Sequence, residues 1–178
     1  MLLHNGEDTA KGIIFCRYYK ECSQLYLLHK KELGIAFTSP VGASDLHRYR
    51  RVEMFTRCTE TSLKEKIVAS FADPASHLRI VIGTIAFGMG LDCPVSTMWS
   101  TLDLLQTYVQ ETGHGGRDGK FCAAILFYTK ADQQYTQKSM MDYCVLEPDA
   151  GDIKCQRQKL FDDFDGGVED PAIAMIFV

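Results

Sequence analysis

Residues 78–94 read LRIVIGTIAFGMGLDCP, and this stretch decides how the chain folds. Leu78 to Gly83 is an apolar, β-branched run, which predicts a buried strand. The glycine-rich residues that follow, Thr84 to Asp92, predict a loop at the carboxyl end of that strand. In open α/β sheets, loops in this position hold the ligand. The stretch therefore predicts both the fold and the place of its chemistry.

Further apolar segments alternate with helix-like segments along the chain. The other predicted strands are Gly12–Cys16, Ile35–Ser39, Val95–Ser100 and Phe121–Tyr128. The predicted helices are Tyr18–Leu33 with Gly34 as its stop, Ser62 to the residue before Asp73, Asp103–Thr112 and Ala131–Cys144. Ser62 and Glu65 have the spacing of a capping box, and Leu63, Ile67, Val68 and Phe71 that of an apolar stripe. This alternation is typical of an α/β domain with a mostly parallel sheet and helices on both faces.

Composition narrows the class of protein. The chain has 178 residues, 46% of them hydrophobic, enough for one domain with a real core. No apolar run approaches the roughly 20 residues of a membrane span, and the first residues do not resemble a signal peptide. Seven cysteines, none spaced as C-x-x-C, indicate a reduced intracellular protein. We therefore expect no membrane partner.

The net charge of −4 argues against nucleic-acid binding through bulk electrostatics. One basic cluster exists, His47 to Arg51, with Arg57 shortly after it. We favour its interpretation as a solvated helix face, while a phosphate contact is the alternative.

Two glycine-rich loops have residue types suited to phosphate chemistry. In the first, Gly88 and Gly90 allow main-chain N–H groups close to an anion, Thr84 offers a hydroxyl, and Asp92 can accept from a ribose hydroxyl. The second loop follows Gln110 and reads ETGHGGRDG.

In that second loop, Arg117 could enter a neighbouring nucleotide site, and Gln110 could position water or sense the phosphate. An ordinary glycine turn with a solvent-facing arginine is the alternative that composition favours. The Gly-x-Gly of the first loop is also weak evidence for a nucleotide site when taken alone, because it lacks the third glycine of a dinucleotide fingerprint.

Together the two loops resemble known helicase motifs. TIAFGMGLDCP resembles motif V of RecQ-like DNA helicases, QETGHGGRDG resembles motif VI, and KGIIFC resembles motif IV. The resemblance runs in the correct order over about Lys11 to Phe164. It implies a RecA-like lobe, the second of two that close on ATP in a 3′-to-5′ DNA helicase.

The resemblance implies a role for each matching residue. Arg117 would be the arginine finger and Gln110 its catalytic neighbour. Asp92, Gly88, Gly90, Gly113 and His114 would bind the nucleotide, and Thr84 and Thr38 would touch the DNA backbone. ATP would be shared with a first lobe that also binds Mg²⁺, because the sequence contains no G-x-x-x-x-G-K-[ST] and no Asp-Glu-x-His.

The sequence also departs from the family pattern. His114 stands where the family has arginine, and imidazole is mostly neutral at pH 7. The segment from Val95 to Thr107 looks shortened. Cys155 resembles the start of a four-cysteine zinc module, but no Cys or His follows it, so we expect no bound metal. We divide the chain into a linker (1–10), the lobe (11–146), and a truncated zinc-module start with an irregular tail (147–178).

Two functions stay open at this point. The chain could supply the motif IV–VI half of a nuclear, ATP-dependent DNA helicase. It could instead be a non-catalytic module that binds DNA or pairs with a helicase lobe. The missing P-loop and His114 favour the second reading for the isolated polypeptide.

Overall fold

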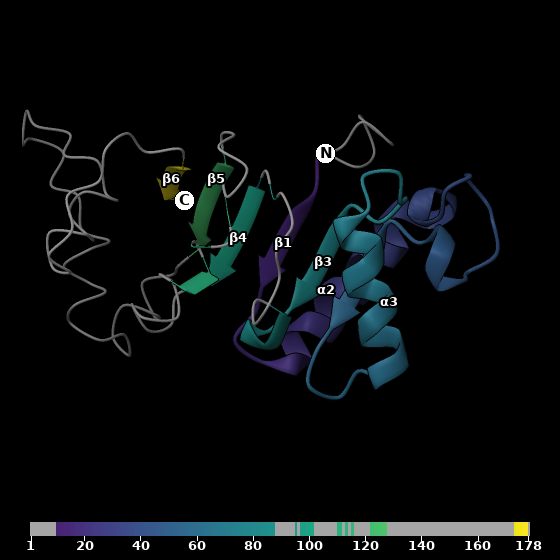
Figure 1. Cartoon of the computed structure of the whole chain (residues 1–178), viewed down its shortest axis with the longest axis horizontal. Helices are drawn as coiled ribbons and strands as arrows, with labels where there is room; N and C mark the ends of the chain where they lie inside the picture. Colours follow the sequence, from purple (N-terminus) through teal and green to yellow (C-terminus); the bar gives the residue numbers. More distant parts are fainter. Residues whose placement is uncertain are drawn as a thin grey trace, which may run out of the picture.

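The computed structural model describes residues 10–87, 95, 97–101, 110–111, 113, 115, 122–127 and 173–177. Within these ranges one parallel sheet runs through the molecule in the order β2-β3-β1-β4-β5-β6 (Figure 1). Its strands are β1 Gly12–Phe15, β2 Val52–Phe55, β3 Ile80–Gly83, β4 Thr97–Thr101, β5 Cys122–Phe127 and β6 Ile173–Phe177. The predicted α/β class is confirmed, as are the strands expected near residues 12, 78, 95 and 121.

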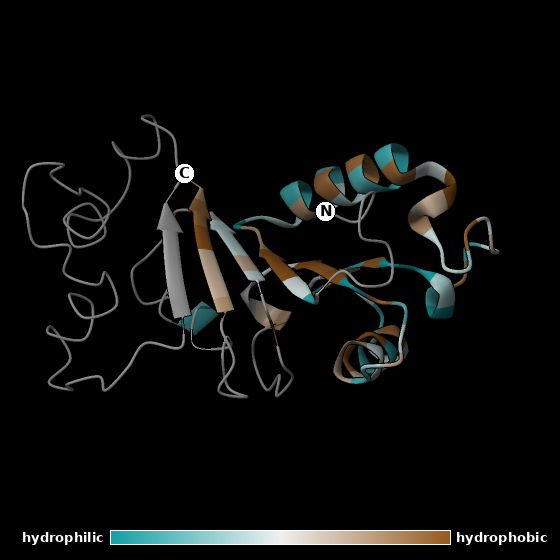
Figure 2. Cartoon of the chain, turned by 90° about the horizontal axis from the view of Figure 1, so that it is seen from above, coloured by the Kyte–Doolittle hydropathy of each residue, from teal (hydrophilic) through white to brown (hydrophobic). Residues whose placement is uncertain are grey.

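Two helices cover opposite faces of the sheet, as the view from above shows (Figure 2). They are α2, Tyr19–Leu33, and α3, Thr61–Ala72. The chain moves outward from β1 to β2 and then back to β3. Because parallel crossovers are right-handed, the reversal of direction places the two connecting helices on opposite faces. The two helices predicted from Tyr18 and from Ser62 are thus confirmed.

Successive side chains of a strand point to opposite faces of the sheet, so each face has its own hydrophobic core. On the α3 face, Ile13 and Phe15 pack with Ile67 and Phe71. Phe87, in the 3₁₀ helix η4 (Ile85–Phe87), also lies in this core, with its ring centroid 4.9 Å from that of Phe55 and 5.6 Å from that of Phe71. On the α2 face the core members are Cys16, Cys22, Leu33, Phe37, Val52, Ile80 and Ile82.

The ends of the two helices have different origins. α2 ends at Gly34, which has a φ of +51° and whose N–H bonds to the carbonyl of Lys30, so the predicted stop is confirmed. α3 begins one residue before the predicted start, with Glu60 at its N-cap. Ser62 donates to the Glu60 carboxylate at 2.7 Å instead of capping the helix, so the predicted capping box is wrong. Val68 is 37% exposed and lies at the margin of the stripe.

The prediction of a strand at Ile35–Ser39 is wrong. Gly34 to Phe37 forms the 3₁₀ helix η2, and Ile35 is 75% exposed. The second strand is β2 instead, and it contains the buried carboxylate of Glu53. A charged residue in the middle of the strand hides the apolar pattern from a reading of the sequence.

The basic cluster is not a solvated helix face, and this interpretation is also wrong. Glu53, only 2% exposed, accepts from Arg50 Nη1 at 3.2 Å and lies 3.1 Å from His47 Nδ1. Asp45 contacts Arg50 Nε and Lys30 Nζ, each at 2.6 Å. The hydrogen bond from Lys30, followed by that from Arg50, lowers the pKa of Asp45. The cluster is thus a half-buried ion network before β2.

The last residues were expected to form an irregular tail without a partner. Ile173 to Phe177 instead form β6, which pairs in parallel with β5 from Cys122↔Ile173 to Leu126↔Phe177. The predicted helices at Asp103–Thr112 and Ala131–Cys144 lie outside the described residues, apart from helical Gln110 and Glu111. In the described part of the chain, no helix has both the length and the hydropathy to cross a bilayer.

Gly83 gives a first test of this packing. A Cβ at Gly83 would lie 2.8 Å from the carbonyl oxygen of Phe55 and 3.2 Å from Phe87 Cβ. Because main chain cannot move aside easily, we expect Gly83→Ala to lower the free energy of unfolding by about 1–3 kcal/mol in urea titrations. Gly42→Ala is the control. The φ of Gly42 is +77°, and a Cβ added there would have no neighbouring atom within 4 Å, so this variant measures backbone strain without crowding. An unfolding midpoint for Gly83→Ala equal to that of the wild type would contradict the packing described.

Candidate nucleotide and DNA site

The carboxyl ends of the parallel strands define one edge of the sheet. Cys16 follows β1, Thr56 follows β2 and Thr84 follows β3. Gln110 and Glu111 join them next to the end of β4, because the Glu111 side chain contacts Ser100 in that strand. The predicted motif IV, V and VI segments therefore reach the same edge.

Thr84 is held at this edge by its own loop. The N–H of Phe87 donates to the carbonyl of Thr84 at 2.9 Å, and the buried Phe87 ring anchors the turn in the core. Thr84 itself is half-buried. Gly88, Gly90 and Asp92, predicted to bind the nucleotide, lie outside the described residues.

The start of the second loop lies against β4 and β5. Gln110 is exposed, whereas Glu111 is only 6% exposed and accepts a hydrogen bond from Ser100 Oγ. Gly113 is exposed in a turn. Gly115 is buried, and a Cβ there would lie 2.5 Å from Cys122 Sγ and 2.6 Å from Met98 Cε. His114 and Arg117 lie outside the described residues.

Thr38 does not join Thr84. It is 5% exposed, its hydroxyl donates to the carbonyl of Ala43 at 3.1 Å, and its backbone pairs with Arg50 before the amino end of β2. The reason is the misplaced second strand. The loop that does follow the second strand begins with Thr56, which is 3% exposed, and Arg57, which is exposed.

One group at this edge was not predicted from the sequence. Arg17 directly follows Cys16, is exposed, and has its guanidinium carbon 5.7 Å from the ring centroid of Tyr18. Tyr18 and Tyr19 are 57% and 68% exposed. The signal was present as Arg-Tyr-Tyr immediately after a strand, a basic and aromatic combination that suits single-stranded nucleic acid.

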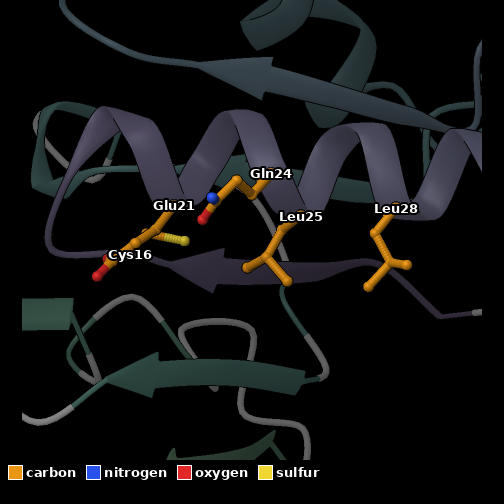
Figure 3. A pocket seen from close by; sticks show the side chains of 5 residues that line it. All are labelled: Cys16, Glu21, Gln24, Leu25 and Leu28. Atoms are coloured by element: carbon orange, nitrogen blue, oxygen red, sulfur yellow. The ribbon is translucent and has the colours of Figure 1, made fainter.

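A pocket of about 320 Å³ runs along α2 from this edge (Figure 3). Its described lining is Cys16, Glu21, Gln24, Leu25 and Leu28, without a basic side chain among these residues. The Cys16 thiol has a raised pKa because it hydrogen-bonds to Cys22, is buried and lies near the carboxylates of Glu21 and Glu111. An apolar wall with a carboxylate at one end does not suit a polyphosphate, so this pocket is not the nucleotide site.

A metal site is not formed by the described residues, in which no three His, Cys, Asp or Glu side chains gather around one point. At the carboxyl edge of the sheet, the described residues offer a nucleotide or DNA the Gln110 amide, the Thr84 hydroxyl and the exposed guanidinium groups of Arg17 and Arg57. Amide, hydroxyl and guanidinium groups are the donors that bind phosphate and ribose oxygens.

Comparison with known proteins gives consistent results. No family model matches the chain. Curated relatives include the ATP-dependent DNA helicase RecQ of Haemophilus influenzae, 32% identical over 57% of this chain. Another is the ATP-dependent DNA helicase Q-like 2 of Arabidopsis thaliana, 30% identical over 76% of this chain. The matched segments make up 16% and 17% of those relatives, so the chain spans less than a fifth of their length.

Solved structures with the same fold include domain 2 of the DEAD-box helicase Mss116p bound to an RNA duplex. It has a TM-score of 0.58 and 18% identity, and the match covers 99% of this chain and 54% of that one. S. cerevisiae Dbp5 bound to RNA and ADP BeF3 has a TM-score of 0.57 and 19% identity, with 98% and 36% covered.

The chain therefore has the RecA-like fold seen in the second domain of these helicases. In sequence, the chain is a homologue of RecQ-like DNA helicases over most of its length, in agreement with its motifs. The resemblance that the sequence indicated is confirmed.

Proposed function

We propose that this lobe supplies the motif IV–VI half of the ATP site in a RecQ-like 3′-to-5′ DNA helicase. The observation that carries the proposal is that Thr84 and Gln110, from motifs V and VI, reach one edge of the sheet. The two relatives named above are ATP-dependent DNA helicases by name. A nuclear location belongs to the same proposal.

At the nucleotide, Arg117 would neutralise charge on the γ-phosphate, with Gln110 beside it. Gly113 and His114 would lie next to the phosphates, and Asp92 next to the ribose, where Gly88 and Gly90 allow close approach. The first lobe would hold Mg²⁺ and most of the ATP. The yeast Dbp5 structure, whose fold this chain shares, contains ADP BeF3, in keeping with a nucleotide at such a lobe.

On the DNA, Thr84 would donate its hydroxyl to a backbone phosphate. Arg57 replaces Thr38 in our proposal, because it is exposed in the loop that follows β2. Arg17, with Tyr18 and Tyr19, could add a charged and stacking contact. Contacts of these kinds follow the strand without reading its sequence.

The purified chain of 178 residues is expected to show no DNA-stimulated ATP hydrolysis, because its sequence contains no P-loop lysine. Turnover is expected once a RecQ-like first lobe is fused to it or supplied in excess. Phosphate release measured with and without DNA, and with the first lobe alone as control, checks both statements. Hydrolysis by the repurified chain alone, or an assembled motor no faster than the first lobe, would contradict the proposal.

A non-catalytic role remains the second candidate, favoured by His114 in place of the family's arginine. In that role the lobe would bind DNA or a helicase lobe without supporting hydrolysis. The same experiment separates the two functions, because binding without an increase in turnover is the expected result for the second.

A further inference from the structure

A buried carboxylate lies directly beside exposed Gln110. Glu111 is 6% exposed, and its carboxylate accepts a hydrogen bond from Ser100 Oγ, which is itself 4% exposed. The negative charge of Glu111 also acts on the Cys16 thiol at the end of β1. Because β1 and β4 are neighbours in the sheet, Glu111 lies at the carboxyl ends of these two strands.

Burying a carboxylate is costly unless it is hydrogen-bonded, so Glu111 stays inside only while its partners hold it. A hydrogen bond to an ionised acceptor is roughly twice as strong as one between neutral groups. The second loop is thus attached to the sheet where it begins.

A second attachment lies four residues later. Gly115 packs closely on Met98 and Cys122, so any side chain added there would have to displace them. Met98 and Ser100 lie on the same face of β4, and Glu111 and Gly115 each contact one of them. Glu111 therefore lies on this face at the carboxyl end of β4, and Gly115 lies on it near the amino end of β5.

We propose that Glu111 is a positioning residue for motif VI and that Ser100 is its anchor on β4. The Ser100–Glu111 pair would fix how the loop leaves the sheet, and with it the place of Gln110 and of the arginine that follows. This inference rests on the proposed function for its catalytic consequence, but the attachment itself does not. A displacement of about 1 Å of a catalytic group can cost on the order of 100-fold in rate.

The attachment can be tested on the purified 178-residue chain by hydrogen exchange with mass spectrometry. We expect Ser100→Ala to speed exchange about tenfold in peptides covering 110–115, since a hydrogen bond to a charged group is lost. Ser100→Thr keeps the hydroxyl and should restore the wild-type rate. Thr97→Ala, on the same strand but the opposite face, is the matched control and should change nothing in 110–115.

Three results would overturn the attachment. They are unchanged exchange in 110–115 for Ser100→Ala, failure of Ser100→Thr to restore the rate, and an equal increase in peptides from α2 and α3. The last result would mean a general loss of stability rather than a local role.

The effect on catalysis is measured as ATP turnover by a motor assembled from this chain and a first lobe. Ser100→Ala should lower kcat at least tenfold with little change in KM for ATP, and Ser100→Thr should recover it. An unchanged kcat in an active motor would refute the positioning role. A wild-type motor without turnover would instead refute the proposed function, while the exchange result would still decide whether Ser100 anchors Glu111.

Discussion

Replacing Arg117 with alanine is expected to lower ATP turnover by about 10³–10⁵-fold in a motor that joins this chain to a RecQ-like first lobe. The guanidinium is planar and permanently charged, so it can bind two phosphate oxygens where negative charge gathers. The measurement is steady-state phosphate release with saturating DNA. Arg117→Lys keeps the charge without the planar fork and should recover only part of the rate.

Two control variants show whether Arg117 acts as an arginine finger or only adds positive charge to this edge of the sheet. Arg57→Ala removes an exposed cation at the same edge of the sheet and should weaken DNA binding without abolishing hydrolysis at saturating DNA. His114→Arg should raise turnover, because it adds a second permanent cation.

If turnover depended on a protonated His114, activity would rise as the pH falls toward about 6, near the ordinary pKa of histidine. His114→Arg would then remove that dependence. An active motor that is indifferent to Arg117→Ala would refute the assignment and leave the fold-level relationship standing.

Much of the fold could be predicted because its elements obey simple periodicities. The strands that contain Ile13 and Val81 are continuous apolar runs, as expected of strands buried on both faces. Gly34 marks the end of α2 because it accommodates a positive φ. Signals of this kind are local, so the sequence alone carries them.

The errors arose where distant partners decide the structure. β2 carries Glu53, which is buried beside the guanidinium of Arg50 and the ring of His47, whereas Ile35, in the apolar run predicted as a strand, is 75% exposed. This misplaced strand led to Thr38 instead of Arg57 as a candidate DNA contact. β6 was missed because a terminal apolar run does not reveal which strand it pairs with.

For the site, the motifs predicted the two glycine-rich loops and Gln110. They did not predict the contacts that attach the second loop to the sheet. The roles of Ser100 and Glu111 depend on β4 lying beside β1, which is a property of strand order. Nothing in the residues around Ser100 indicates a partner 11 positions away. The residues that we propose to touch the ligand stand in motifs that are visible in the sequence, whereas a residue that positions them is visible only once the strand order is known.

Glu53→Ala is expected to lower the free energy of unfolding by about 3 kcal/mol, since removing one partner of a buried ion pair leaves the other charge uncompensated. Asp45→Asn is the matched control. It removes a carboxylate from the same Arg50, but the Asp45 side chain is 42% exposed, so its loss should cost less than about 1 kcal/mol.

Urea titrations followed by circular dichroism would measure both variants, together with Arg50→Ala and the double variant Arg50→Ala/Glu53→Ala. The double variant should cost less than the sum of the two single ones, because each single change already breaks the same pair. A larger cost for Asp45→Asn than for Glu53→Ala would mean that the exposed half of the network stabilises the fold. Additive costs would mean that burial of the Glu53 side chain, rather than its pairing with Arg50, holds β2 in the sheet.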